Sequence, residues 1–243
     1  MQDRQSMLIE LGIVGIIGYI LFFISTNVNP TLGSIYTLPL ILGLVLAIVD
    51  YSFGSKTIKL INKNVTWGTA LMWAVGGYVA VLLSSQLASK LATVVPLTEI
   101  LNLLGSTAPV FSNSAGLNWF TFSILIAFVE TYAFFVIALD ILCSMFSVEI
   151  DKRNLYNPKM WIILFSLSFL FMMYHVTSKG VQSEATLILV FFMAMISLIS
   201  LIWTKDARGA LGIHIIANGI ASASIFGIFK IQNLIIPIIH LIS

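Results

Sequence analysis

The chain has 243 residues, of which 59% are hydrophobic and only 9% charged, and its formal net charge is +2. Soluble domains carry about 25% charged residues, so this composition excludes a water-soluble globular protein. The sequence also contains no basic run of the kind that binds nucleic acid, which excludes that class of partner. It therefore predicts an all-α, multi-pass membrane protein whose helices contact the lipid bilayer.

Seven apolar segments are long enough to cross the roughly 30 Å hydrocarbon layer of a bilayer. They cover residues 8–25, 36–53, 66–88, 119–147, 158–177, 184–204 and 208–229. No signal-peptide cleavage site follows the first segment, so it is expected to stay in the protein. Residues 90–116 are expected to form a short interfacial helix and a loop. The C-terminal tail, which Pro237 interrupts, is expected to be an interfacial segment, a re-entrant segment or half of an eighth crossing. Residues 1–243 are expected to form a single membrane-embedded domain.

Lysine and arginine residues are unevenly distributed over the predicted loops. Seven crossings place nine of them on one side of the membrane: Arg4, Lys56, Lys59, Lys63, Lys152, Arg153, Lys159, Lys205 and Arg208. Only three, Lys90, Lys179 and Lys230, fall on the other side. Because cytoplasmic loops are enriched in Lys and Arg, the N-terminus is predicted to be cytoplasmic.

A few polar side chains lie inside the predicted membrane helices, where they are costly and often functional. Glu130 falls near the middle of the fourth helix, and His175 lies on the fifth. His214 and Asn218 are four residues apart on the seventh, which places them on one helical face. These four residues are expected to meet in one site, whereas Asp140 is expected to pair or cap within the bundle.

Small residues recur at every fourth position of the seventh helix, at Gly219, Ala223 and Gly227, and would let a neighbouring helix approach closely. The predicted depths of the two histidines differ. His175 lies near the outer end of its helix, and His214 about 10 Å from the inner end of its own. They can meet only if the fifth helix is longer, the seventh begins deeper, or a helix is kinked.

Two kinds of chemistry fit a glutamate, two histidines and an asparagine. In the first, the carboxylate and one imidazole deprotonate a water molecule, and the second imidazole and the amide stabilise the resulting oxyanion. In the second, two histidines and one glutamate hold a zinc ion that keeps a position open for water. Both schemes are hydrolytic, and the sequence leaves both open.

The motifs around these residues resemble those of the CAAX-protease and bacteriocin-processing family of intramembrane proteases. That family carries an E-E-x-x-x-R box, then F-x-x-x-H, then H-x-x-x-N. Here F-M-M-Y-H supplies Phe171 and His175, and H-I-I-A-N supplies His214 and Asn218, in the family's order. The likeness covers residues 119–230.

The resemblance implies an intramembrane endopeptidase that cleaves a membrane-associated peptide or protein. Glu130 and His175 would activate water, and His214 and Asn218 would stabilise the oxyanion. Members of the family are often called metalloproteases, although its prenyl endopeptidases look like metal-free glutamate enzymes. The resemblance therefore favours a metal-free mechanism and leaves zinc possible.

The first motif departs from the family's pattern, because it reads V-E-T-Y-A-F-F. The second glutamate is replaced by Val129 or Thr131, and the arginine by Phe134 or Phe135, depending on which glutamate Glu130 represents. Loss of both charges together is electrostatically coherent, since a buried arginine without its carboxylate would be costly.

The degenerate motif supports an alternative function, in which the chain is a catalytically inactive relative that serves as a membrane-embedded binding or scaffold subunit. Intramembrane acids and histidines also suit a transporter or a proton relay. The sequence shows neither the half-repeats nor the pair of broken helices that are typical of transporters.

Overall fold

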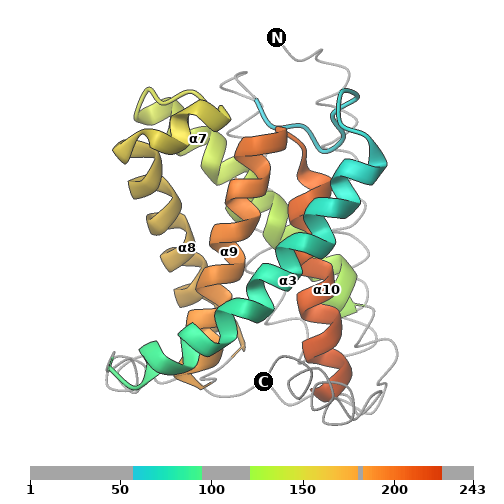
Figure 1. Ribbon diagram of the computed structural model, residues 1–243, viewed down its shortest axis with the longest axis vertical. Helices are drawn as coiled ribbons and strands as arrows, with labels where there is room; N and C mark the ends of the chain where they lie inside the picture. Colours follow the sequence, from blue (N-terminus) through green and yellow to red (C-terminus); the bar gives the residue numbers. More distant parts are fainter. Residues whose placement is uncertain (1–56, 95–120, 180–182, 226–243) are drawn as a thin grey trace.

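The computed structural model describes residues 57–94, 121–179 and 183–225, which form a bundle of long helices joined by short loops (Figure 1). The predicted helices at 8–25 and 36–53 lie outside the described residues, as do most of the segment 90–116 and the tail. The long helices are α3 (Trp67–Ala92), a continuous helix over residues 121–145, α8 (Pro158–Lys179), α9 (Glu184–Thr204) and α10 (Ala207–Ile225). The 3-10 helix η3 (Lys152–Tyr156) precedes α8.

Four described helices are long and apolar enough to cross a membrane: Trp67–Ala92, Ser123–Met145, Pro158–His175 and Glu184–Thr204. They coincide with four of the seven predicted crossings, so the helical, multi-pass membrane character of the chain is confirmed. The predicted crossing at 208–229 is described as α10 over Ala207–Ile225 and is not one of these four.

The helix over residues 121–145 is the central element of the bundle. It is built from the π-helical η1 (Thr121–Ile126), α6 (Ala127–Glu130), the π-helical η2 (Thr131–Ile137) and α7 (Ala138–Met145). It packs against α8, α9 and α10, and its side chains are mostly buried. In contrast, α3 exposes large apolar side chains along one face, as a lipid-facing helix does: Trp67, Leu71, Met72, Val75, Val79, Leu82, Leu83 and Leu87.

Glycines bring α3 and α10 into close contact. A Cβ atom built on Gly77 of α3 would overlap the side chain of Ile213, and one built on Gly212 of α10 would overlap the Cβ of Ala74. The described residues thus show a close helix approach at Gly77 and Gly212, and the approach predicted at Gly219, Ala223 and Gly227 stays a prediction. Of the predicted stripe, the side chain of Ala223 and the whole of Gly227 lie outside the described residues.

Helix ends are fixed by capping side chains. The hydroxyl of Thr66 accepts a hydrogen bond from the amide of Thr69 at the start of α3 (3.1 Å), and Ser183 caps α9 in the same way through Thr186 (3.3 Å). Lys205 ends α9 with a left-handed backbone (φ 53°), which turns the chain sharply into α10. These short polar signals position α10 beside α3.

Buried Asp140 of α7 holds the chain segment that precedes α3. Its carboxylate accepts hydrogen bonds from the amide of Thr57, at 2.9 Å to Oδ2 and 3.2 Å to Oδ1, and from the amide of Ile58 at 3.4 Å. Asp140 is 3% exposed. The prediction that this residue pairs or caps within the bundle is therefore confirmed.

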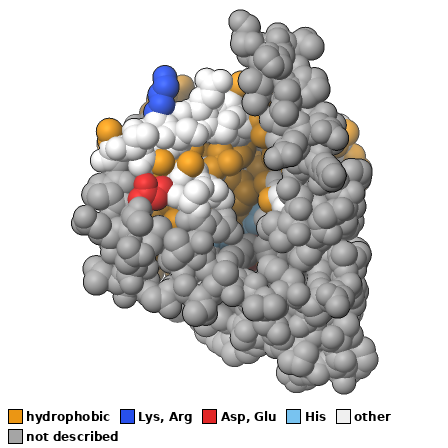
Figure 2. Space-filling model, turned by 90° about the horizontal axis from the view of Figure 1, so that it is seen from below, with side chains coloured by type: hydrophobic (Ala, Val, Ile, Leu, Met, Phe, Trp, Pro, Cys, Tyr) orange, Lys and Arg blue, Asp and Glu red, His pale blue; other side chains and the backbone are white. Residues whose placement is uncertain are grey.

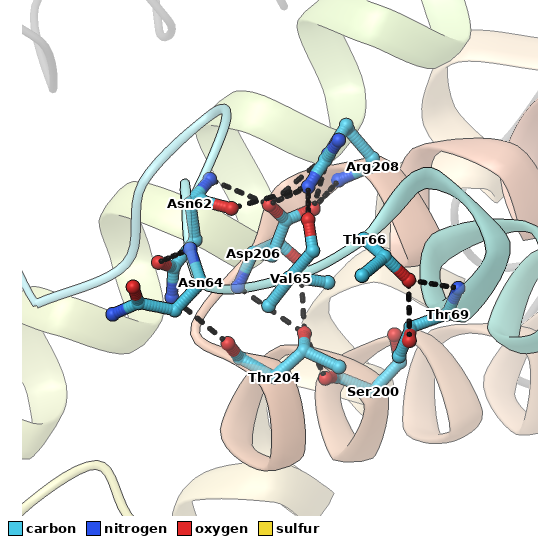
Figure 3. A network of polar contacts seen from close by, with 9 residues as sticks. All are labelled: Asn62, Asn64, Val65, Thr66, Thr69, Ser200, Thr204, Asp206 and Arg208. Atoms are coloured by element: carbon cyan, nitrogen blue, oxygen red, sulfur yellow. Dashed lines mark hydrogen bonds and ion pairs between the residues drawn. The ribbon is translucent and has the colours of Figure 1, made fainter.

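A second buried carboxylate, Asp206, ties the same segment to the start of α10 (Figure 3). It accepts hydrogen bonds from the amides of Asn62 (2.6 Å) and Arg208 (2.9 Å). The Arg208 guanidinium forms an ion pair with Asp206 at 2.9 Å and donates to the Val65 carbonyl at 2.6 Å. It also lies 4.4 Å from the ring centroid of Trp67. Residues 62–67 are thus clamped onto α10.

Most of the described basic residues lie at the same end of the bundle as this clamp (Figure 1). Seven residues belong to this basic end: Lys59, Lys63, Lys152, Arg153, Lys159, Lys205 and Arg208. The other two described basic residues, Lys90 and Lys179, lie near the opposite ends of α3 and α8. The charge asymmetry expected from the sequence is therefore present in the described part of the fold.

Candidate functional site

Two of the four predicted site residues are in direct contact at the centre of the bundle. The Nε2 atom of His214, on α10, lies 3.2 Å from the Oε2 atom of Glu130, at the end of α6. Both side chains are 0% exposed. The other ring nitrogen, Nδ1, lies 3.0 Å from the hydroxyl of Thr131. Two adjacent residues of the central helix therefore contact the two nitrogens of the imidazole.

The local backbone contributes to this arrangement. Glu130 ends the short α-helical segment α6, which lies between the π-helical segments η1 and η2. A π-helical turn contains more residues than an α-helical turn, so it turns the chain through a smaller angle at each residue. Such segments are rare in proteins and are often found at functional sites. Here η1 and η2 lie on either side of the segment that ends at Glu130, and η2 itself begins with Thr131.

The third predicted residue, His175, lies against the same aromatic ring as His214. The ring centroid of Phe171 is 4.5 Å from that of His175 and 5.5 Å from that of His214. The sequence predicts the two histidines at different depths. In the structure both of their rings contact the same side chain, that of Phe171. His175 is 3% exposed.

The hydrogen bond of His175 identifies its protonated nitrogen. Nδ1 lies 3.0 Å from the carbonyl oxygen of Phe171. Because a carbonyl can only accept, Nδ1 must carry the proton. In a neutral ring this leaves Nε2 as the basic nitrogen. His175 is thus oriented as a proton acceptor.

The fourth predicted residue, Asn218, lies one helical turn after His214 on α10 and is 7% exposed. Its position, four residues from His214, places it on the same face of the helix. The structure therefore brings Glu130 into contact with His214 and packs His175 and His214 against Phe171, with Asn218 one turn after His214 on α10.

Phe134 and Phe135, which follow Glu130 on the central helix, pack against Phe171. The ring centroids of Phe134 and Phe135 lie 5.4 Å and 4.7 Å from that of Phe171. Phe135 is fully buried, and Phe134 also lies 4.8 Å from the ring of Tyr174. Apolar aromatic side chains thus pack around Phe171, which contacts both histidines.

Within the described residues, no three His, Cys, Asp or Glu side chains lie close enough together to hold a metal ion. This holds for the predicted set of Glu130, His175 and His214, whose side chains are all described. The arrangement of donors therefore does not fit a three-ligand zinc site.

The face of the molecule opposite the basic end is hollowed. Figure 2 shows hydrophobic side chains along the hollow and a histidine side chain deeper within it. The two described histidines, His175 and His214, are both nearly or completely shielded from solvent. The hollow therefore lies at the end of the bundle where few of the described basic residues are found.

Sequence reasoning missed Thr131 as a partner of His214. Its position next to the glutamate was noted as a departure from the family's motif, but nothing in the composition distinguishes a hydrogen-bonding threonine from one that packs. Phe171 was recognised as part of a motif, whereas its contact with both histidines required the packing of three helices.

Comparison of the chain with protein-family models, with curated proteins and with solved structures gave no match. The function is therefore inferred from the site itself.

Proposed function

We propose that the chain is an intramembrane endopeptidase that hydrolyses a peptide bond in a membrane-associated peptide or protein. The observation that supports this proposal best is the contact between the carboxylate of Glu130 and the imidazole of His214 in the core of a membrane bundle, at 3.2 Å. A carboxylate–imidazole pair at this depth is costly for the fold, and such groups commonly serve function.

In the proposed mechanism, Glu130 and His175 bind a water molecule and remove its proton as the water attacks the peptide carbonyl. The hydrogen bond from Nδ1 of His175 to the Phe171 carbonyl supports this role, because it leaves Nε2 as the accepting atom. N–H groups of His214 and Asn218 then stabilise the oxyanion that forms. No metal ion is required for any of these steps.

The basic end of the bundle faces the cytoplasm in this proposal, and the N-terminus is cytoplasmic. The support is the concentration of described Lys and Arg residues at that end. The hollow in Figure 2 would then open away from the cytoplasmic end and admit the substrate.

A second candidate function is a non-catalytic membrane subunit that binds a partner. One observation favours it: the ring of Phe171 contacts both histidines, and Glu130, His175, His214 and Asn218 are at most 7% exposed. In that case the polar cluster would fix the packing of α8, α10 and the central helix, and would not react.

The test compares peptide termini in membranes of cells that express the wild-type chain, Glu130→Gln or Glu184→Gln. Glu184 lies in the first turn of α9 and is partly exposed, so its substitution is a matched control. Loss of a general base should lower the yield of chain-dependent termini by roughly 10²-fold or more in Glu130→Gln. The control should resemble the wild type.

Unchanged termini in a correctly folded Glu130→Gln variant would rule out the proposed chemistry. If no terminus depends on the wild-type chain at all, the non-catalytic function becomes the better explanation.

A further inference from the structure

Three segments that are far apart in the sequence meet at the basic end of the bundle (Figure 1). The amide of Lys59, before α3, donates to the carbonyl of Lys205, which follows α9 (3.2 Å). The ammonium group of Lys205 lies 3.5 Å from Oδ2 of Asp151, and the guanidinium of Arg153 lies 3.1 Å from Oδ1 of the same carboxylate. One carboxylate thus holds the start of η3 against the turn between α9 and α10.

A further cation lies on the same surface. The ammonium group of Lys152 is 5.6 Å from the ring centroid of Trp203, in the last turn of α9. The face of a tryptophan ring attracts a cation, so Lys152 is held beside Lys205. The side chain of Lys205 is half-buried, and those of the other three cations are exposed. We call this surface the basic platform, and it consists of Lys59, Lys152, Arg153 and Lys205.

Positive charge is in excess around the basic platform. The seven residues of the basic end face four carboxylates in the described part of the chain: Asp140, Glu149, Asp151 and Asp206. Asp140 and Asp206 are buried, so neither presents a negative charge at the surface. The surface that remains is therefore cationic and attracts anions.

The length of α9 places the basic platform relative to the bilayer. The 21 residues of Glu184–Thr204 span roughly 30 Å at about 1.5 Å per residue, which is the thickness of the hydrocarbon layer. Lys205 follows this helix directly. Its side chain therefore lies at the level of the lipid phosphates, just outside the hydrocarbon.

Exposed aromatic side chains mark the same level. Trp203 is 52% exposed, Tyr156 ends η3, and Trp161 lies near the start of α8. The indole N–H of Trp161 donates to the Leu155 carbonyl (2.6 Å), which fixes η3 to α8. Trp and Tyr are enriched where a membrane protein meets the lipid headgroups. Farther along α8, the large exposed side chains are apolar, as lipid contact requires: Ile162, Phe165, Phe169 and Leu170.

We propose that the basic platform binds the phosphate groups of anionic phospholipids in the leaflet at this end of the bundle. Its ammonium and guanidinium groups donate charge-assisted hydrogen bonds to phosphate oxygens. A lipid fits this surface better than a soluble anion does, because the cations lie beside exposed aromatic rings at the edge of the hydrocarbon layer. The proposal goes beyond hydrolysis and does not depend on it.

The test is native mass spectrometry of the full-length protein in a neutral detergent, with phosphatidylglycerol or phosphatidylcholine added at the same concentration. Both lipids contain a phosphate, but only phosphatidylglycerol has a net charge. The ratio of their apparent Kd values is measured for the wild type, Lys59→Gln and Lys152→Gln. Lys90→Gln is the matched control, because Lys90 is exposed in the last turn of α3, at the opposite end of the bundle. Thermal unfolding verifies that each variant is folded.

Phosphatidylglycerol should bind more tightly than phosphatidylcholine, by roughly ten-fold or more, to the wild type and to the control. Loss of one cation at the headgroup level should lower this preference by roughly five-fold in Lys59→Gln and in Lys152→Gln. Equal affinities for the two lipids in the wild type would overturn the proposal. A loss in Lys90→Gln as large as that in Lys152→Gln would overturn the assignment to the basic platform.

A soluble anion is distinguished from a lipid by adding glycerophosphoglycerol, the headgroup of phosphatidylglycerol without its acyl chains. At the same concentration it should leave the bound lipid in place, because it lacks the chains that lie along the apolar helices. Displacement by the headgroup alone would reject the lipid in favour of a soluble phosphate ester. No peptide is cleaved in these measurements, so their outcome is separate from that of the proposed function.

Discussion

Gly212 of α10 packs directly against Ala74 of α3, so that a Cβ atom at position 212 would overlap the Cβ of Ala74. Neither atom belongs to a flexible side chain, because a Cβ is fixed by its backbone. Gly212→Ala is therefore expected to push the two helices apart and to lower the free energy of unfolding by about 1–3 kcal/mol. Thermal or denaturant unfolding in detergent micelles measures this change.

Gly76 supplies a control with the opposite sign. A Cβ at position 76 of α3 would meet nothing within 4 Å. Because alanine loses less backbone entropy than glycine in a helix, Gly76→Ala should raise stability by about 0.5–1 kcal/mol. Equal effects of the two substitutions would contradict the close packing of α3 on α10.

Asp140→Asn should loosen the segment before α3. The carboxylate accepts from the amides of Thr57 and Ile58, whereas an asparagine side chain offers one oxygen and turns an NH₂ group toward the donors. The expected loss is about 1–3 kcal/mol, with faster hydrogen exchange at both amides. Exposed Glu149→Gln is the control, and exchange that is equally slow in both variants would contradict this anchoring role.

Arg208→Lys should open the same segment at its other end. A lysine cannot reproduce the fork that binds Asp206 and the Val65 carbonyl, nor the planar contact with Trp67. Trypsin cleavage after Lys63 should become roughly ten-fold faster, as expected for the loss of charge-assisted hydrogen bonds. Arg153→Lys, whose side chain is 87% exposed, should leave that rate unchanged. Equal rates in both variants would rule out the clamp.

Asp151 provides a test of pH dependence outside the membrane helices. Hydrogen bonds from the backbone and side chain of Arg153 lower the pKa of Asp151 from 3.8 to about 2. A lowered folded-state pKa means that ionised Asp151 stabilises the fold above about pH 4, and that this contribution is lost as the pH falls toward 2. The wild type should thus exceed Asp151→Asn in stability at pH 6 and match it near pH 2. A difference independent of pH would contradict this assignment.

Much of the described fold follows from the sequence because apolar segments of spanning length have few alternatives in a membrane. The positions of α3, α8 and α9 were predicted to within a few residues at most ends. Asp140 was correctly expected to have a structural role, because a lone carboxylate in a helix needs donors. The helix contact made by Gly77 and Gly212 was missed. Every small residue in an apolar helix could allow a neighbouring helix to approach closely, and only the packed structure shows which of them do so.

The site was predictable only in part. Glu130 and His214 were correctly predicted to contact each other, because both side chains are costly to bury in a membrane. The structure shows this contact. The sequence contains no sign of the π-helical segments beside Glu130, because π-helices have no compositional signature that separates them from α-helices. The predicted difference in depth between His175 and His214 arose from treating each helix as a straight rod with fixed ends. The contact of both rings with Phe171 shows that this treatment was too simple.

The clamp at the basic end also has a consequence for biosynthesis. The Thr57 amide binds a carboxylate that lies 83 residues later, and the Asn62 amide binds one that lies 144 residues later. At about 5–20 residues per second, a ribosome needs roughly 7–30 s to make those 144 residues. During that interval α3 can already be inserted while the segment before it has no carboxylate to bind. The segment before α3 therefore reaches its final contacts only after Asp206 and the start of α10 have been made. Among the described helices, the last to be synthesised is thus the one that fixes this early segment.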